Sequence, residues 1–127
     1  MEKHVIRTEA APAPFQGAPY NQAIRVGDLV FTAGQVGLRP DGGPMGGDIA
    51  AQTEQVFANL RAILESAGSS LDKLVKTTVF LQDFDDFQAM NEVYARHVGE
   101  RPPARSTVEV AKLPGGALVE IEAVAHL

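Results

Sequence analysis

The fold is decided by the stretch Pro102-Pro103-Ala104-Arg105-Ser106-Thr107-Val108-Glu109-Val110 and the segment that follows it, Leu118-Val119-Glu120-Ile121-Glu122-Ala123-Val124. Both segments alternate with the period of two that half-buried strands show. The linker between them, Ala111-Lys112-Leu113-Pro114-Gly115-Gly116, is rich in turn-forming residues. The pattern therefore predicts an antiparallel hairpin.

The predicted hairpin has one apolar face, which we expect to pack against helices, and one polar face. The polar face would collect Arg105, Thr107 and Glu109 from the first strand with Glu120 and Glu122 from the second. One interpretation is a solvated surface, which antiparallel sheets commonly have. The other is a site in which the arginine binds an anion and a carboxylate positions a water molecule.

Composition limits the classes of protein to which the chain can belong. Its 127 residues, 45% of them hydrophobic, predict a single folded domain over residues 1–127. A net charge of −5 provides no attraction to nucleic acid, whose phosphates require a basic surface. The absence of cysteine excludes disulfides and thiolate sites. Without a signal peptide or an apolar run of membrane-spanning length, we expect a cytoplasmic protein that binds neither nucleic acid nor membrane.

Periodicity and capping residues predict the remaining elements. The predicted strands are Lys3–Thr8, then Gln22–Val26 and Leu29–Ala33, which form a hairpin through Gly27-Asp28, and Leu74–Gln82, which has Val75, Thr77, Val79 and Leu81 on one side. The first predicted helix covers Ile49–Ala67, between an Asp48 N-cap and Gly68. The second covers Phe84–Val98 and is capped by Asp83. The glycine-rich residues 37–47 are interpreted as a surface turn.

The predicted order is therefore β-β-β-α-β-α-β-β, an α+β fold with a mixed sheet and both helices on one face. Two helices cover only one face of a sheet. The other face would expose apolar positions such as Leu118 and Val124 beside its charges. Proteins commonly bury such a surface by forming oligomers.

Several motifs resemble the signature of the Rid family of reactive-intermediate deaminases (YjgF/YER057c/UK114). The matching segments are Pro19-Tyr20-Asn21-Gln22-Ala23, Thr32-Ala33-Gly34-Gln35, Lys76-Thr77-Thr78-Val79-Phe80, Asp86-Phe87 with Asn91 and Tyr94, Pro103-Ala104-Arg105-Ser106, Val108-Glu109-Val110-Ala111, Leu113-Pro114 and Val119-Glu120-Ile121-Glu122. They span nearly the whole chain. The resemblance implies a chorismate-mutase-like fold that assembles as a homotrimer, with ligand clefts between adjacent subunits.

The resemblance also implies roles for individual residues. Arg105 would clamp the substrate carboxylate, which suits the paired donors of a guanidinium, and Glu120 would hold and polarise the attacking water. An ion pair of Arg105 with Glu120 or Glu122 across the hairpin is the alternative for the arginine. A solvated cross-strand charge is the alternative for Glu120.

Four further residues match the family's substrate-binding positions. Tyr20 would line the cleft, and the Gly34 carbonyl would face the substrate nitrogen. Asn91 would be a polar cleft residue, with a helix-surface amide as the alternative. Thr107, where many relatives carry cysteine, would bind the carboxylate through its backbone amide. Ala33 stands where a serine is common, which removes one hydrogen bond to the ligand.

The function implied is hydrolysis of reactive enamines and imines, namely 2-iminobutanoate and 2-iminopropanoate, to 2-keto acids and ammonia. Neither a metal nor an organic cofactor is expected, since the three histidines lack ligand spacing. A non-catalytic module that binds small carboxylates is one alternative. A ribonuclease or chaperone role is another, although the acidic net charge argues against RNA.

Overall fold

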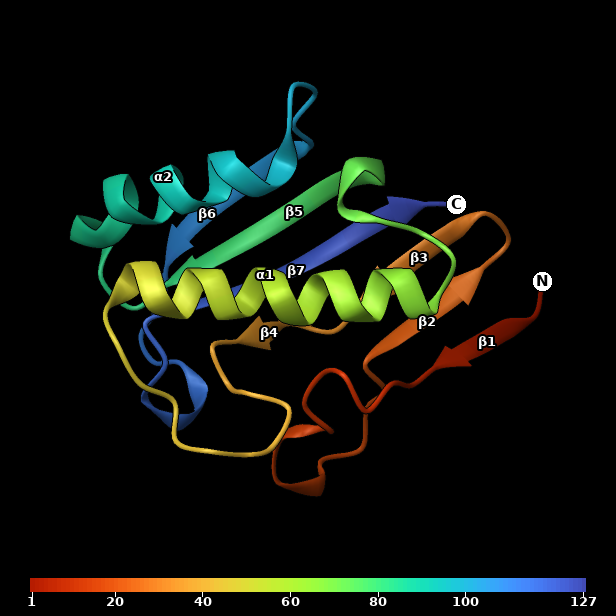
Figure 1. The fold of residues 1–127 in the computed structure, drawn as a ribbon, viewed down its shortest axis with the longest axis horizontal. Coiled ribbons are helices and arrows are strands. Elements are labelled where there is room, and N and C mark those ends of the chain that lie inside the picture. The colour runs from red at the N-terminus through yellow and green to blue at the C-terminus, as the bar shows by residue number, and fades with distance from the viewer.

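A computed structural model describes residues 1–127, which form one sheet with two helices packed on it (Figure 1). The strands are β1 (Lys3–Ile6), β2 (Ala23–Val26), β3 (Leu29–Thr32), β4 (Gln35–Val36), β5 (Leu74–Leu81), β6 (Ala104–Glu109) and β7 (Val119–His126). The helices are α1 (Ile49–Ser66) and α2 (Phe87–Val98), with 3₁₀ turns η1 (Phe15–Gly17), η2 (Leu71–Lys73), η3 (Phe84–Asp86) and η4 (Pro114–Gly116).

The sheet is mixed, as predicted. Its strand order is β1-β2-β3-β7-β5-β6, with β4 pairing to β7 beyond the end of β3. Only β5 and β6 are parallel. Figure 1 shows both helices in front of the same face of this sheet, which confirms the predicted α+β arrangement. The two-residue strand β4 was not predicted, because a segment this short has no detectable period.

The predicted hairpin of the last two strands is wrong. β6 does not pair with β7; β5 lies between them, parallel to β6 and antiparallel to β7. The reason is the helix α2, which connects β5 to β6 as a crossover, and crossovers join parallel neighbours. The linker after β6 then passes the end of β5 to reach β7. Its Leu113 N–H donates to Gln82 Oε1 at 3.0 Å just beyond β5.

The prediction that Arg105 and Glu120 lie on one polar face is wrong for the same reason. Residues paired across a sheet lie on the same face. Arg105 pairs with Thr77, which in turn pairs with Ala123, so all three lie on the helix-covered face. Glu120 is an odd number of residues from Ala123 on β7 and lies on the open face. Arg105 and Glu120 are therefore on opposite faces of the sheet.

The first helix begins and ends where its capping residues predict. The Asp48 carboxylate accepts a hydrogen bond from the Ala51 N–H at 2.9 Å, and Gly68 follows the helix with a φ of +87°. An apolar stripe on this helix faces the sheet, and its members Val56, Phe57, Leu60, Ile63 and Leu64 are fully buried. No helix of the structure is both long and apolar enough to cross a membrane.

Two local expectations are corrected. Val75 is 46% exposed, because the pairing of β5 with β7 shifts register between Leu74 and Lys76, and the alternation begins only after this irregularity. The second helix begins at Phe87, three residues later than predicted, since the Asp83 carboxylate caps the 3₁₀ turn η3 by accepting from the Asp85 N–H at 2.8 Å.

The open face of the sheet carries exposed apolar side chains, as expected from an arrangement with two helices. Val5, Leu29, Phe31 and Val108 all lie on it, and each is 40% to 47% exposed. Val124 lies on the same face beside Phe31. Leu118, which was expected there, instead packs against the core.

Candidate functional site

Glu120 lies in a pocket of about 330 Å³ on the open side of the sheet. Its strand β7 pairs here with β4, so Val36 stands directly opposite the glutamate. The pocket is lined by Phe15, Ala18, Tyr20, Ala33, Gly34, Val36, Pro114 and Glu120. Glu120 is the one charged residue among them.

The surroundings of Glu120 make its carboxyl group easier to protonate than that of an ordinary surface glutamate. Burial raises the pKa of its half-buried carboxyl, and the nearby charge of Glu122 raises it further. A carboxylic acid with a raised pKa is a better match to a general base or acid at neutral pH than an ordinary surface glutamate. The pocket therefore has a suitable group for activating a water molecule.

Gly34 is required next to this carboxylate for reasons of space. A Cβ atom at this position would overlap the Glu120 carboxylate and lie 2.8 Å from its Cδ. The backbone of Gly34 is not in the left-handed region. The glycine therefore serves the close approach of the glutamate rather than a special φ.

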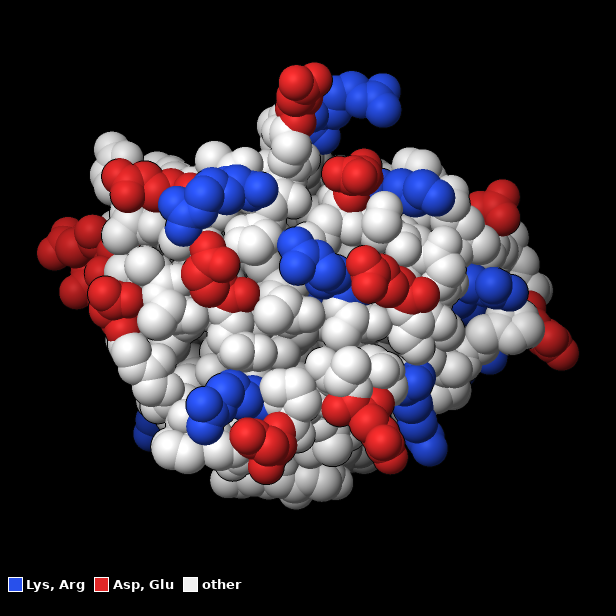
Figure 2. All heavy atoms as spheres, in the orientation of Figure 1, with Lys and Arg blue, Asp and Glu red and all other residues white.

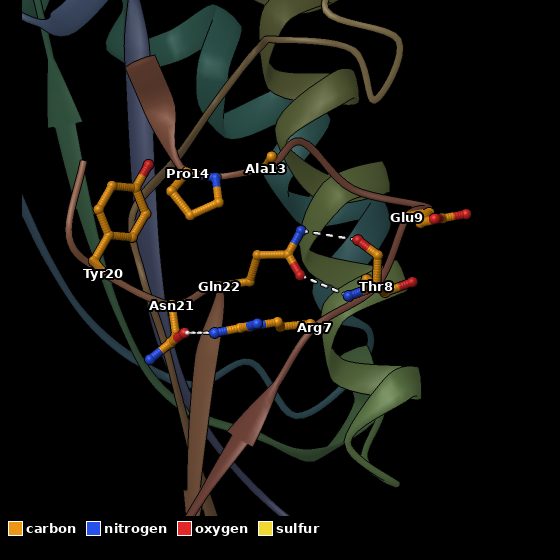
Figure 3. Close-up of a pocket in the computed structure, with 8 residues that line it drawn as sticks. All are labelled: Arg7, Thr8, Glu9, Ala13, Pro14, Tyr20, Asn21 and Gln22. Atoms are coloured by element: carbon orange, nitrogen blue, oxygen red, sulfur yellow. Dashed lines mark hydrogen bonds between the residues drawn. The ribbon is translucent and has the colours of Figure 1, made fainter. Parts of the chain in front are cut away.

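Tyr20 lines both the Glu120 pocket and a more polar pocket of about 430 Å³, which Figure 3 shows. In that pocket Arg7 Nη2 lies 3.4 Å from Asn21 Oδ1. The buried Gln22 side chain accepts from the Thr8 N–H at 2.7 Å and donates to three backbone carbonyls, those of Thr8, Ala11 and Pro12. These bonds hold the loop between β1 and β2, and with it Tyr20, in place.

Arg105 lies in a second cluster, on the helix-covered side of the sheet. Its Nη1 donates to Asn91 Oδ1 at 2.8 Å, and its guanidinium carbon lies 4.7 Å from the ring centroid of Tyr94 and 5.6 Å from that of Phe87. Arg105 makes no ion pair. The alternative of an ion pair with Glu120 or Glu122 is therefore wrong, and the guanidinium retains donors for a ligand.

The Tyr94 ring under the arginine is anchored from the sheet. Its hydroxyl lies 2.6 Å from Thr77 Oγ1. Burial raises the pKa of Tyr94, an effect that the Thr77 hydrogen bond and the Arg105 charge oppose. The phenol therefore stays neutral and presents a rigid aromatic face to the guanidinium.

Thr107 follows Arg105 on the same face of β6. Its Oγ1 is buried and has no hydrogen-bond partner. β6 is the last strand of the sheet, so one edge of its backbone has no partner strand. An anion held by Arg105 can thus also meet backbone N–H groups of this strand.

The structure brings the predicted site residues together as two groups rather than one. Arg105, Asn91 and Thr107 form a cationic group beside α2. Glu120, Gly34 and Tyr20 form a group around a carboxylate on the other side of the sheet. Within one chain the two groups do not meet.

Sequence reasoning missed residues in both groups. Tyr94 was named among the residues that match the family, but no role in the site was predicted for it. Phe15 and Pro114 line the Glu120 pocket, but both lie in loops without periodicity. Only the folded chain places them there.

The comparisons with known proteins agree with this fold. A sequence model of the family described as Endoribonuclease L-PSP matches residues 8–127. A RutC family protein of Pyrococcus abyssi is 51% identical over 127 residues, covering 99% of this chain and 98% of that protein. Reactive Intermediate Deaminase A, chloroplastic, of Arabidopsis thaliana is 44% identical over 128 residues, covering 100% of this chain and 67% of that protein.

Solved structures show the same similarity. RidA from an Antarctic Psychrobacter is 43% identical and superposes with a TM-score of 0.93, with 98% of this chain and 99% of that chain covered. Escherichia coli TdcF, solved with bound serine, is 38% identical with a TM-score of 0.91, and 98% of each chain is covered.

Proposed function

Because the chain belongs to the endoribonuclease L-PSP family, also called the Rid or YjgF/UK114 family, we propose that it hydrolyses reactive 2-imino acids to 2-keto acids and ammonia. The substrates proposed are 2-iminobutanoate and 2-iminopropanoate. One observation carries the proposal: Glu120, with its raised pKa, is the one charged group in its pocket, while Arg105 has no anionic partner.

The reaction requires little beyond positioning. The carbon of a protonated imine is already electrophilic, so a water molecule attacks it while Glu120 takes one proton from that water. A C–O bond forms, and the proton passes to the nitrogen. The C–N bond then breaks while Glu120 takes the proton of the new hydroxyl group, which leaves a keto group, and the released ammonia takes up that proton as ammonium. In total, one iminium ion and one water give one 2-keto acid and one ammonium ion.

The other residues of the two groups would hold the substrate. Arg105 would clamp the substrate carboxylate with two parallel hydrogen bonds, and its bond to Asn91 would keep the guanidinium oriented. The Thr107 amide would add a third donor. On the Glu120 side, Tyr20 would line the cleft and the Gly34 carbonyl would face the substrate nitrogen. Holding substrate and water in this way is itself a large part of catalysis.

A site that uses both Arg105 and Glu120 requires two chains, because the two residues lie on opposite faces of one sheet. The exposed apolar side chains on the open face support an assembly through that face. We therefore propose a homotrimer in which each cleft takes Arg105 from one subunit and Glu120 from the next.

Light scattering at micromolar concentration is expected to give three times the chain mass of 13.5 kDa, because a trimer buries the open sheet face. Introducing a charge at Phe31, by Phe31→Glu, should lower the measured mass, since it places a carboxylate on this apolar surface. A monomeric wild-type protein would contradict both the trimer and the shared site.

The activity is tested with 2-iminobutanoate generated in situ by a threonine dehydratase. The protein is expected to accelerate ammonia release beyond the uncatalysed rate. Binding of a keto acid without any acceleration would favour the alternative of a non-catalytic carboxylate-binding module. A nucleic-acid role has no support in the charge distribution: net charge is −5, and Figure 2 shows basic and acidic residues interspersed over the helix side.

Gly34→Ala should reduce imine hydrolysis by about 10-fold, because a methyl group there displaces the Glu120 carboxylate from its position against the backbone. Steady-state rates with 2-iminobutanoate measure the effect. Gly46→Ala is the matched control, since a Cβ there meets nothing within 4 Å. Equal activity of the two variants would show that the contact between Gly34 and Glu120 does not matter for turnover.

A further inference from the structure

Most of the Glu120 pocket is apolar. Besides Glu120, Tyr20 and Gly34, its walls are Phe15, Ala18, Ala33, Val36 and Pro114. These side chains offer a ligand contact surface but few hydrogen bonds. The part of a substrate that extends past the reacting carbon into this pocket is therefore best matched when it is itself apolar.

Phe15 is held in this wall by its own turn. It begins the 3₁₀ turn η1, whose Gln16 and Gly17 have φ values of +53° and +68°. The backbone N–H of Phe15 donates to the Tyr20 hydroxyl at 2.6 Å. Tyr20 thus fixes the backbone from which the Phe15 ring projects.

The Phe15 ring is also supported from two other loops. A Cβ added to Gly115 would lie 3.4 Å from the Phe15 ring and 3.3 Å from Met45 Cε. The ring therefore packs where η4 and the glycine-rich loop after β4 meet. The glycine-rich loop, interpreted from the sequence as a surface turn only, contributes Met45 to this support.

Phe15 also lines a smaller neighbouring pocket of about 20 Å³. Phe15, Tyr20, Gly34 and Val36 line both pockets. Phe15 therefore lies where the two pockets adjoin.

We propose that Phe15 is a specificity-determining residue, whose ring forms an apolar subsite for the substrate side chain and favours 2-imino acids of leucine size over those of alanine size. This inference rests on the proposed imine hydrolysis. An additional methylene in an apolar pocket changes kcat/KM by roughly 10-fold or more. The isobutyl group of the leucine-derived imine is larger than a methyl group by three carbon atoms. Its kcat/KM should therefore exceed that of the alanine-derived imine by at least ~10-fold.

The test compares these two imines on one preparation. D-amino acid oxidase with catalase generates them from D-leucine and D-alanine, and the imine carbon is planar, so the stereochemistry of the amino acid does not matter. The loss of imine is followed by trapping what remains with semicarbazide. Wild-type protein is expected to favour the leucine-derived imine, and Phe15→Ala to lower the ratio of the two kcat/KM values by ~10-fold. Phe15→Leu, which keeps an apolar side chain, should retain most of the ratio.

Two further variants separate the subsite from general damage. Tyr20→Phe removes the acceptor of the Phe15 N–H and should lower the ratio to a smaller extent. Phe84→Ala removes a more exposed phenylalanine, 44% exposed and outside the Glu120 pocket, and should leave the ratio unchanged. Light scattering and circular dichroism establish that each variant is folded and assembled.

The outcomes distinguish the proposed Phe15 subsite from the proposed imine hydrolysis on which it rests. If both imines are hydrolysed and Phe15→Ala leaves the ratio unchanged or raises it, the subsite is overturned while imine hydrolysis stands. If the wild-type protein shows no preference for the leucine-derived imine, the subsite is likewise overturned. If the wild-type protein hydrolyses neither imine, the proposed function and the subsite are both overturned.

Discussion

Arg105→Lys is expected to lower kcat/KM for 2-iminobutanoate by ~10²-fold, a loss typical of a bound substrate that is no longer correctly oriented. Lysine keeps the positive charge but presents a point charge in place of two parallel donors. It would also lose the planar contact with Tyr94 and the hydrogen bond to Asn91, which lies at 2.8 Å in the structure. A substrate carboxylate would then be bound loosely and in several orientations. Steady-state kinetics of ammonia release measure the effect.

Arg105→Ala should abolish the activity and leave the protein folded, because the guanidinium forms no ion pair in the chain. Circular dichroism and light scattering provide this control. Near-normal activity of Arg105→Lys would mean that another group binds the carboxylate. An unfolded Arg105→Ala variant would mean that the contacts with Asn91 and Tyr94 stabilise the fold.

Glu120→Gln is expected to lower imine hydrolysis by ~10²-fold or more, the usual contribution of a positioned acid or base. The substitution preserves the shape of the side chain against Gly34 but removes the negative charge that polarises water. Binding of a stable 2-keto acid should change little or become tighter, because a repelling carboxylate is lost. Calorimetric titration and the ammonia assay on the same preparation measure binding and turnover together.

The pH dependence provides a second test of Glu120. Burial and Glu122 raise the pKa of Glu120 above 4.5, and only the ionised form accepts a proton from water. Wild-type activity should therefore fall as pH falls through this raised pKa. The residual activity of Glu120→Gln should lack that acidic limb. Unchanged turnover in Glu120→Gln would remove this residue from the chemistry.

Mixing the two inactive variants tests whether one cleft uses two chains. In a trimer of randomly mixed Arg105→Ala and Glu120→Gln subunits, about a quarter of the clefts would combine an intact Arg105 with an intact Glu120. Activity should therefore return to about a quarter of the wild-type value after joint unfolding and refolding. If the mixture stays inactive although light scattering shows trimers, the proposal that each cleft takes Arg105 and Glu120 from different chains is contradicted.

Much of the local structure was predictable from the residues themselves. The turn at Gly27-Asp28 connects β2 to β3 as expected, and Asp48 caps α1 at the predicted position. Such features depend on interactions over a few residues, which the sequence displays directly. The prediction that Val75 shares the buried side of β5 failed for the converse reason. The register shift depends on pairing with the distant strand β7, and such a shift leaves no mark on the local alternation.

The residues of the candidate site were named by their resemblance to a family, while their chemistry alone left alternatives open. An arginine and a glutamate on neighbouring strands are equally consistent with an ion pair and with a binding site. The structure decides against the ion pair, because Arg105 turns toward Asn91 and α2. It also adds Phe15, which no periodicity indicated as part of the Glu120 pocket.

Apart from the two-residue strand β4, the sequence by itself determined the types of its helices and strands and their order, because helix and strand periods, caps and turns are local properties of the chain. It did not determine which strands are neighbours. The insertion of β5 between β6 and β7 depends on α2 packing across the sheet, a contact between residues distant in the sequence. Since every in-register pair shares a face, this one choice of neighbour places Arg105 under the helices and Glu120 on the open side. Tertiary structure alone therefore decided that the two residues lie on opposite faces of the sheet.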